Sequence, residues 1–244
     1  MLSENELQRY QRHFQINGWN PEIQLKLKES SVFVAGSGGL GSPVLYYLAA
    51  AGIGCIKFCD RDIVDLGNLN RQILFGSDDI GKDKVNAAYS RLSGLNSDIR
   101  LEPLKNEINT KIIPDIKGCD LIVDCVDNFE TRHFLNRVSF DLNIPMVHAG
   151  VTEFFCQLTF LKPGETPCLS CFIPEGTQQS GKGITGAMAG IAGSIQALEA
   201  IKYLTGLGDI LTNRLLFIDM KNLSFNTMTL KKNPECKVCS GFRR

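Results

Sequence analysis

Apolar runs and amphipathic stretches alternate along the first 150 residues of the chain. The run Ser-Val-Phe-Val-Ala-Gly at 31–36 is continuous and ends in glycine, which is typical of a buried parallel strand. Four further strands are predicted, at 55–60, 99–104, 121–126 and 146–150. Intervening stretches predict helices that end near Gly52 or cover 82–95 and 130–142. Because strand and helix alternate, the pattern predicts a doubly wound, Rossmann-like parallel sheet.

The pattern changes after Gly150. Extended, hairpin-forming strands are predicted at 154–161, 214–219 and 224–230, with one long apolar helix between them at about 190–204. This second part is too small for an independent core, and no repeat or low-complexity linker separates it from the first. We therefore expect one α/β domain, 1–244, whose parallel half is extended by antiparallel strands.

Two helices are predicted before the first strand. Ser3 and Glu6 have the spacing of a capping box and apolar residues follow at helical spacing, so the first helix should cover 3–16. Asn20-Pro21 predicts the start of a second, short helix. The domain would then consist of a helical arm at 1–30 and two halves at 31–150 and 151–244.

Composition narrows the class of protein. Hydrophobic residues make up 43% and charged residues 21%, which suits a chain with a substantial core. Lys+Arg and Asp+Glu both number 26, so there is no basic excess of the kind that nucleic-acid binders carry. The N-terminus is acidic, unlike a signal peptide, and the apolar stretches are too short to span a bilayer. We expect a cytoplasmic protein with neither nucleic-acid nor membrane partners.

A glycine-rich loop follows the first strand. Gly36, Gly38, Gly39 and Gly41 lie in Gly-Ser-Gly-Gly-Leu-Gly, a match to G-x-G-x-x-G, and they let backbone N–H groups approach a phosphate. Asp60, 19 residues further on at the end of the second strand, can accept hydrogen bonds from a ribose. The loop could serve packing alone, but the strand, helix and acid around it favour a nucleotide. An NAD(P)-dependent oxidoreductase would begin in the same way.

The residues that follow favour a triphosphate. The segment 62–72 is dense in Asp, Asn and Arg, and Lys84 lies at the head of a predicted helix. Arg71 and Lys84 supply two cations for a polyphosphate, and Asp127, after a later strand, supplies a carboxylate for Mg²⁺. Taken singly, either cation could be a solvated surface charge and Asp127 a helix N-cap.

Nine cysteines include two C-x-x-C pairs, Cys168/Cys171 and Cys236/Cys239, separated by 64 residues. Four thiolates fit tetrahedral Zn²⁺, and a closed four-cysteine site is structural rather than catalytic. A redox pair is the alternative. The remaining five cysteines lie in or beside apolar runs, and most of them are predicted to be buried, inert thiols.

These segments together resemble the MoeB/ThiF/HesA family, the bacterial relatives of ubiquitin-activating enzymes. The resemblance runs from residue 9 to residue 239 and is carried most specifically by Asn-Leu-Asn-Arg-Gln at 68–72. It is also carried by Arg-Tyr-Gln-Arg at 9–12, the glycine loop, 81–85, 124–128 and the cysteine pairs.

The resemblance implies a role for each matching position. Gly39 and neighbouring amides would contact phosphates, Arg71 and Lys84 would hold the triphosphate together with Asn68, and Asp127 would organise Mg²⁺. Arg12 would reach into the active site of the other subunit of a homodimer, although it could also be an exposed surface charge. The nucleotide site implied in full comprises Gly36, Gly38, Gly39, Gly41, Asp60, Asp62, Asn68, Leu69, Asn70, Arg71, Gln72, Lys84, Asp127 and Asn128.

The implied reaction is ATP-dependent adenylation of the C-terminal glycine carboxylate of a ubiquitin-like sulfur-carrier protein ending in Gly-Gly, similar to MoaD or ThiS. Pyrophosphate would be released, and the product would serve sulfur transfer in molybdopterin, thiamine or related biosynthesis. Catalysis would rest on Arg71, Lys84, Asp127 and Arg12. A non-catalytic scaffold that binds a ubiquitin-like protein is the alternative.

One position departs from the family pattern. Many members carry a cysteine in the loop before the long helix, where a covalent bond to the carrier can form. The matching place falls near Gln179, and residues 178–183 contain no cysteine. The same loop imitates a Walker A motif but lacks its Ser/Thr, because Gly183 follows Lys182. We therefore expect adenylation without a thioester or acyl-disulfide on this chain.

Overall fold

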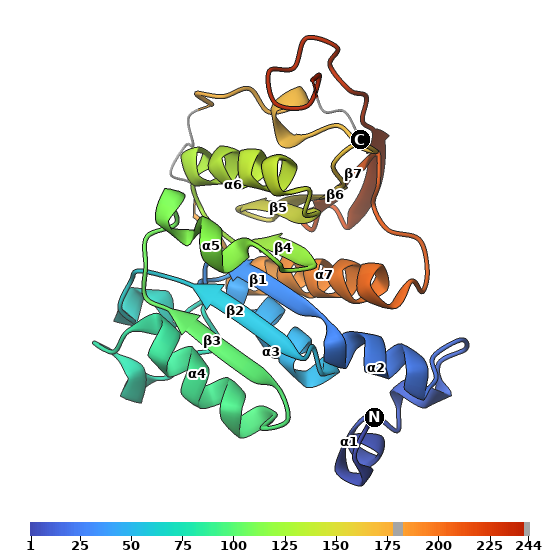
Figure 1. Ribbon diagram of the computed structural model, residues 1–244. Helices are drawn as coiled ribbons and strands as arrows, with labels where there is room; N and C mark the ends of the chain where they lie inside the picture. Colours follow the sequence, from blue (N-terminus) through green and yellow to red (C-terminus); the bar gives the residue numbers. More distant parts are fainter. Residues whose placement is uncertain (178–182, 242–244) are drawn as a thin grey trace.

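The computed structural model describes residues 1–177 and 183–241, and within them an eight-stranded sheet forms the centre of the molecule (Figure 1). Its strand order is β3-β2-β1-β4-β5-β6-β7-β8. The strands are β1 (Ser31–Ala35), β2 (Cys55–Cys59), β3 (Arg100–Leu104), β4 (Leu121–Asp124), β5 (Met146–Thr152), β6 (Phe155–Leu161), β7 (Arg214–Asp219) and β8 (Ser224–Thr229).

The first five strands are parallel, and β5 to β8 are antiparallel neighbours. In β1 four of five residues are buried, as a strand covered on both faces requires. In β8 five of six residues are exposed, so this edge strand contributes little to the core. The predicted fold class, a parallel half extended by antiparallel strands, is confirmed.

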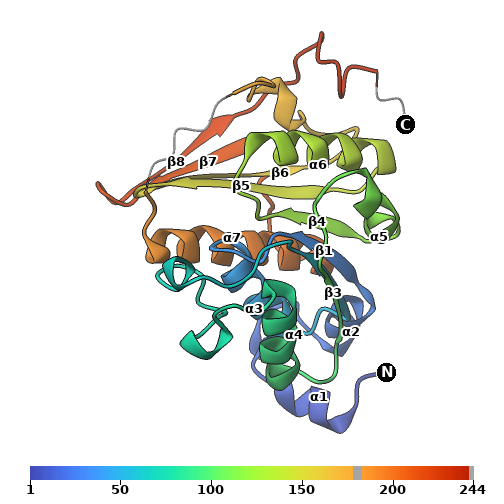
Figure 2. The ribbon, with the colours of Figure 1, turned by 90° about the vertical axis from the view of Figure 1, so that its left-hand side faces the viewer.

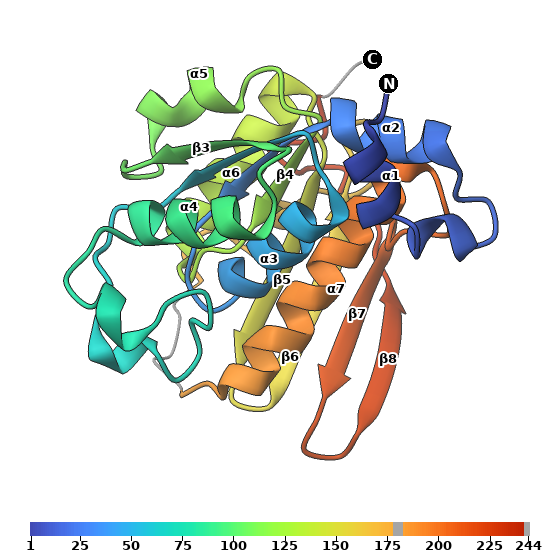
Figure 3. The ribbon, with the colours of Figure 1, turned by 90° about the horizontal axis from the view of Figure 1, so that it is seen from below.

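Helices cover both faces of the sheet (Figure 2). On one face lie α3 (Gly41–Ala51), α4 (Lys84–Leu95) and α7 (Gly186–Thr205), seen together in the view from below (Figure 3). They pack over the larger apolar cluster. On the other, α5 (Ile113–Ile116) and α6 (Phe129–Leu142) pack over the second cluster. Short 3₁₀ turns lie at His13–Gln15, Leu66–Asn68, Ser77–Asp79, Thr110–Ile112 and Leu169–Cys171. Among the described helices, none is long and apolar enough to cross a membrane.

The chain order places a switch in direction between β1 and β4. The crossover after β1 passes over one face and the crossover after β4 over the other, so the loops that follow these neighbouring strands diverge. Gly36, at the end of β1, has φ +95°, and a Cβ there would lie 2.9 Å from the carbonyl oxygen of Cys125. Ligands of open α/β sheets bind in the crevice at such a switch.

The N-terminal arm differs from its prediction. The helix expected over 3–16 ends early, as α1 (Glu4–Arg9), and α2 (Pro21–Glu29) follows a 3₁₀ turn. Tertiary contacts explain the break, because the Tyr10 hydroxyl accepts a hydrogen bond from Asn96 Nδ2 at 3.0 Å and lies against Gly52. The capping box between Ser3 and Glu6 is present as predicted.

Helix α7 belongs to the second half by sequence but packs on the first half. Its largest contacts outside the sheet are with α3, and it also contacts β5. Gly193 makes the approach possible, since a Cβ there would lie 2.6 Å from the carbonyl oxygen of Leu40. At the start of the helix, a Cβ on Gly186 would lie 2.3 Å from the carbonyl oxygen of Asn70. The division of the domain into an arm and two halves, with boundaries at residues 30 and 150, stays a prediction.

Candidate active site

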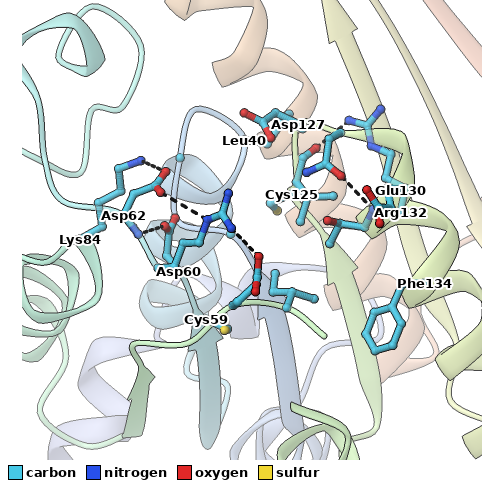
Figure 4. Close-up of a pocket in the computed structure, with 18 of the residues that line it drawn as sticks. Leu40, Cys59, Asp60, Asp62, Lys84, Cys125, Asp127, Glu130, Arg132 and Phe134 are labelled. Atoms are coloured by element: carbon cyan, nitrogen blue, oxygen red, sulfur yellow. Dashed lines mark hydrogen bonds and ion pairs between the residues drawn. The ribbon is translucent and has the colours of Figure 1, made fainter. Parts of the chain in front are cut away.

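A cavity of about 850 Å³ opens at the carboxyl ends of the parallel strands. Its walls come from the loops after β1, β2, β3 and β4, with Asp60, Asp62 and Lys84 on one side and Asp127, Glu130 and Arg132 on the other (Figure 4). Ten of the predicted nucleotide residues line it: Gly36, Gly38, Gly39, Asp60, Asp62, Arg71, Gln72, Lys84, Asp127 and Asn128.

The glycine loop and Asp60 are hydrogen-bonded to each other. Asp60 Oδ2 accepts from the backbone N–H of Ser37 at 2.9 Å and from its hydroxyl at 3.0 Å. Asp60 Oδ1 accepts from the N–H of Asp62 at 2.9 Å. One carboxylate thus holds the turn after β1 and the turn after β2 together.

The glycines of the loop have two different tasks. Gly39 faces the cavity, and a Cβ there would make only ordinary van der Waals contacts, with Ala189 Cβ at 3.4 Å and the Arg71 side chain at 3.6 Å. Gly41 does not line the cavity; a Cβ there would lie 2.1 Å from the carbonyl oxygen of Gly36, so its task is packing. The open backbone at Gly38 and Gly39 forms a cradle that fits phosphate groups.

Two cations border this cradle. Lys84 is only 5% exposed, and its Nζ lies 3.1 Å from Asp62 Oδ2. Arg71 Nη1 donates to the carbonyl oxygen of Gly67 at 2.9 Å and to Asn70 Oδ1 at 2.9 Å. Both side chains are therefore oriented by the 62–72 segment before any ligand binds, and the cradle with its cations fits a polyphosphate.

Besides Gly41, four predicted site residues lie away from the cavity wall. Asn68 completes a capping box with Asp65, and Leu69 packs against the larger apolar cluster. Asn70 accepts a hydrogen bond from Arg71. Arg12 is exposed on the N-terminal arm and donates to Gln15 Oε1 at 3.2 Å.

Asp127 and Asn128 form the wall after β4. Asp127 is exposed to the cavity. The N-cap of α6, which was the alternative role for Asp127, belongs to Asn128, whose Oδ1 accepts from the N–H of Thr131 at 2.8 Å. The Asp127 carboxylate thus lies beside the phosphate cradle without capping the helix, an arrangement that suits a Mg²⁺ ligand.

Several residues that line or support the wall carried no signal in the sequence. Ser37 lies inside the glycine motif at a variable position, yet it binds Asp60. Arg132 lies within a helical pattern, and 106–110 follows β3 without a motif. The only available indication for 106–110 was topological, because it follows the carboxyl end of a parallel strand.

A model of the ThiF family matches residues 10–238. The chain belongs to the ThiF family. It is 38% identical over 245 residues to the SAMP-activating enzyme E1 of Haloferax volcanii, covering 98% of this chain and 90% of that protein. It is 36% identical over 249 residues to the sulfur carrier protein adenylyltransferase of Thermus thermophilus, covering 97% and 92%.

Two further proteins are similar to the ThiF chain, one in sequence and one in structure. The sulfur carrier protein ThiS adenylyltransferase of Escherichia coli is 35% identical over 246 residues, covering 98% of both chains. The crystal structure of Escherichia coli MccB with ATP superposes with a TM-score of 0.86 at 27% identity, covering 96% of this chain and 75% of that one. The resemblance inferred from the motifs is confirmed at the level of the family.

The four paired cysteines of the ThiF chain meet at one place. Their sulfur atoms all lie within 4.8 Å of one another, and the pairs Cys168–Cys236 and Cys171–Cys239 are 3.4 and 3.3 Å apart. A zinc ion about 2.3 Å from each of four sulfurs needs sulfur–sulfur distances of about 3.8 Å. The cluster therefore fits zinc, and it packs against Phe140 of α6.

The other five cysteines are buried, as predicted. Burial raises the pKa of Cys59 and of Cys156 to about 12, and it raises the pKa of the fully buried Cys125 as well. A thiol with a raised pKa is a poor nucleophile. The prediction that concerns Gln179 lies outside the described residues.

Proposed function

We propose that this ThiF-family chain uses ATP to adenylate the C-terminal carboxylate of a ubiquitin-like sulfur-carrier protein ending in Gly-Gly. The supporting observation is the single cavity lined by the glycine loop, Asp60, Arg71, Lys84 and Asp127. The relatives named as adenylyltransferases of sulfur carriers support the same reaction, and the MccB structure with ATP supports the nucleotide.

The charges in the cavity suit this chemistry. A carboxylate must approach a triphosphate, so the repulsion between two anions has to be reduced. Arg71 and Lys84 lie beside the cradle for this purpose, and Asp60 is positioned for the ribose. The carrier carboxylate attacks the α-phosphate in line and pyrophosphate leaves. No general base is needed, because the attacking carboxylate is already ionised, and the protein contributes positioning and electrostatic stabilisation.

Asp127 is the proposed ligand of Mg²⁺. Asp127 would hold the ion, which would supply positive charge to stabilise the leaving pyrophosphate. Asp127 supports this role because its carboxylate faces the cavity while the capping of α6 is left to Asn128.

Arg12 is proposed to act across a homodimer. It is exposed on the N-terminal arm and lies outside the wall of its own cavity, so the proposed contribution is to the site of a second copy. Exposed apolar side chains on α3 and α7, Tyr47 and Leu198, are 54% and 55% exposed and suit an interface between copies.

The carrier is proposed to dock on the 151–244 half. Three apolar side chains there, Phe154, Leu223 and Phe225, are 48–71% exposed. They lie on β8 and the turns beside it, where the β7–β8 hairpin extends beyond the edge of α7 (Figure 3). Exposed apolar patches of this kind mark protein interfaces.

The paired cysteines are proposed to hold a structural zinc ion that ties the segment around Cys236 and Cys239 to the loop at Cys168 and Cys171. Zinc thiolates together with ATP chemistry suit the reducing cytoplasm. Since no cysteine lies at 178–183, the carrier is proposed to leave as the adenylate, without a covalent bond to this chain.

ATP–pyrophosphate exchange with candidate carriers tests the proposal. Each carrier is compared with a version that lacks its terminal Gly-Gly. Exchange that requires the intact tail supports adenylation, and the carrier with the highest kcat/KM identifies the pathway. Absence of ATP binding would overturn the proposal, and ATP binding without exchange with any carrier would favour a scaffold.

A further inference from the structure

Val126 precedes Asp127, and both of its backbone polar groups are bonded to buried charged side chains. Its N–H donates to Asp124 Oδ1 at 3.2 Å, and its carbonyl oxygen accepts from Arg132 Nη2 at 2.7 Å. On the other side of Asp127, Asn128 is held by its capping bond to Thr131. The backbone is thus restrained on both sides of the proposed Mg²⁺ ligand.

The guanidinium of Arg132 is closely surrounded. The residue is 5% exposed, its Nε lies 3.6 Å from Asp124 Oδ2, and its Cζ lies 5.4 Å from the centre of the Phe129 ring. A Cβ on Gly150 would lie 3.4 Å from Nη1. A planar guanidinium can meet Asp124 and the Val126 carbonyl at once, whereas a lysine ammonium offers no such fork.

Asp124 is itself fixed by elements on both faces of the sheet. It is fully buried, and its Oδ2 lies 2.7 Å from His148 Nδ1 on β5. Its backbone carbonyl accepts from Gln196 Nε2 of α7 at 2.8 Å. A buried carboxylate is tolerated only where it is paired in this way, so its orientation relative to Val126 is determined by α6, β5 and α7 together.

We propose that Asp124 and Arg132 are positioning residues that fix Val126 and thereby present the Asp127 carboxylate to the metal of bound ATP. The proposal rests on the proposed function, because it takes Asp127 as a metal ligand. Mutation of the groups that orient a metal ligand typically lowers metal affinity by about 10–100-fold. If Asp127 is already ordered when the metal binds, the free energy of ordering its side chain does not weaken metal binding.

The test uses Arg132→Lys, which retains the charge, and Asp124→Asn, which retains the size and the oxygen that accepts from Val126. The affinity of Mn²⁺ for the protein–ATP complex is compared with its affinity for ATP alone by electron paramagnetic resonance, and ATP binding is measured by calorimetry in EDTA. We expect Mn²⁺ affinity to fall roughly 10–100-fold in both variants, with metal-free ATP affinity unchanged within about twofold. Arg91→Lys, an arginine paired with Asp79 on the surface, should change neither.

Every other outcome contradicts either the metal role of Asp127 or the positioning role of Asp124 and Arg132. If the unmodified protein–ATP complex binds Mn²⁺ no more tightly than ATP alone does, the metal role of Asp127 fails whatever the variants do. If it binds Mn²⁺ and both variants bind it equally well, the positioning role is wrong. If metal-free ATP affinity falls as far as Mn²⁺ affinity, Arg132 contacts the nucleotide directly and the positioning role is again wrong. Should Arg132→Lys not fold, Asp124→Asn decides.

Discussion

The carboxylate of Asp60 accepts two hydrogen bonds from Ser37, one from the backbone N–H at 2.9 Å and one from the hydroxyl at 3.0 Å. The residue that we assign to the ribose therefore also determines the shape of the glycine loop. Nucleotide affinity and the conformation of the phosphate cradle are coupled through one side chain.

Replacing Asp60 should consequently have two effects. Asp60→Ala leaves the Ser37 N–H without its acceptor, which destabilises the fold by about 1–3 kcal/mol. We expect ATP affinity to fall by more than about tenfold, since both the ribose contact and the loop geometry are lost. Chemical unfolding and calorimetry measure the two quantities. Asp98→Ala, which removes only a surface ion pair with Arg9, should change stability by less than about 1 kcal/mol.

Lys84 and Lys82 provide a matched pair of substitutions. Lys84 is buried at the cavity wall, whereas Lys82 is an exposed partner of Asp79. Lys84→Met should lower kcat for pyrophosphate exchange roughly 100-fold, the typical effect of removing one preorganised charge stabiliser. Lys82→Met should leave exchange within about twofold. Equal effects of the two substitutions would contradict a catalytic role for Lys84.

Zinc removal should act on stability. Purified protein should contain one zinc per chain by elemental analysis, and Cys236→Ser should lose it. Because metal binding contributes to folding free energy, Tm should fall by about 5 °C or more; 1 kcal/mol corresponds to roughly 2–4 °C in a domain of this size. Cys156→Ala, at a buried thiol of β6 outside the cluster, should retain the zinc. Zinc retained by Cys236→Ser would exclude the four-cysteine site.

The proposed docking surface can be tested on β8. Phe225→Ser removes an apolar side chain that is 60% exposed, so it should raise KM for the carrier by about tenfold. ATP affinity should not change, because β8 contributes no residue to the cavity wall. The neighbouring Asn226→Ser points to the opposite face of the strand and serves as the control. An unchanged KM in Phe225→Ser would place the carrier elsewhere.

Stability should also depend on pH through His148. Burial lowers the pKa of His148 below its ordinary value near 6.5, although the bond to Asp124 opposes the shift. The folded state therefore binds fewer protons than the unfolded state, and the contribution of His148 to stability is present above about pH 6.5 and lost as pH falls below it. Urea unfolding from pH 7.5 to 5.5 should show this decline, and His148→Gln should have a shallower slope. An identical slope in that variant would exclude His148 as a source.

The strands were predictable to within one or two residues because buried parallel strands require continuous apolar runs. The runs at 31–36 and 55–60 each ended one residue beyond the strands β1 and β2. The arm was predicted less well, since α1 ends where Tyr10 packs against Gly52, a contact between segments far apart in sequence. Periodicity cannot report such a contact.

Some residues of the candidate site were predictable from the sequence and others were not. Asp60 and Lys84 follow motifs with fixed spacing, so the sequence locates them. Arg132 has no such signal, because its importance comes from meeting Asp124 and Val126 only after α6 has packed on the sheet. Asn128, assigned to the nucleotide, turned out to cap α6 as well. Residues that act through tertiary hydrogen bonds are the ones that a pattern search overlooks.

The late position of α7 in the chain has a consequence for biosynthesis. The helix covers α3 and the parallel strands, yet its residues, Gly186–Thr205, are translated after every one of those strands. Until it emerges from the ribosome, the apolar face of α3 that it covers stays open to solvent. Nascent chains in this state expose surface that promotes aggregation. Chaperone contact during synthesis should therefore be greatest between translation of residue 150 and translation of residue 205.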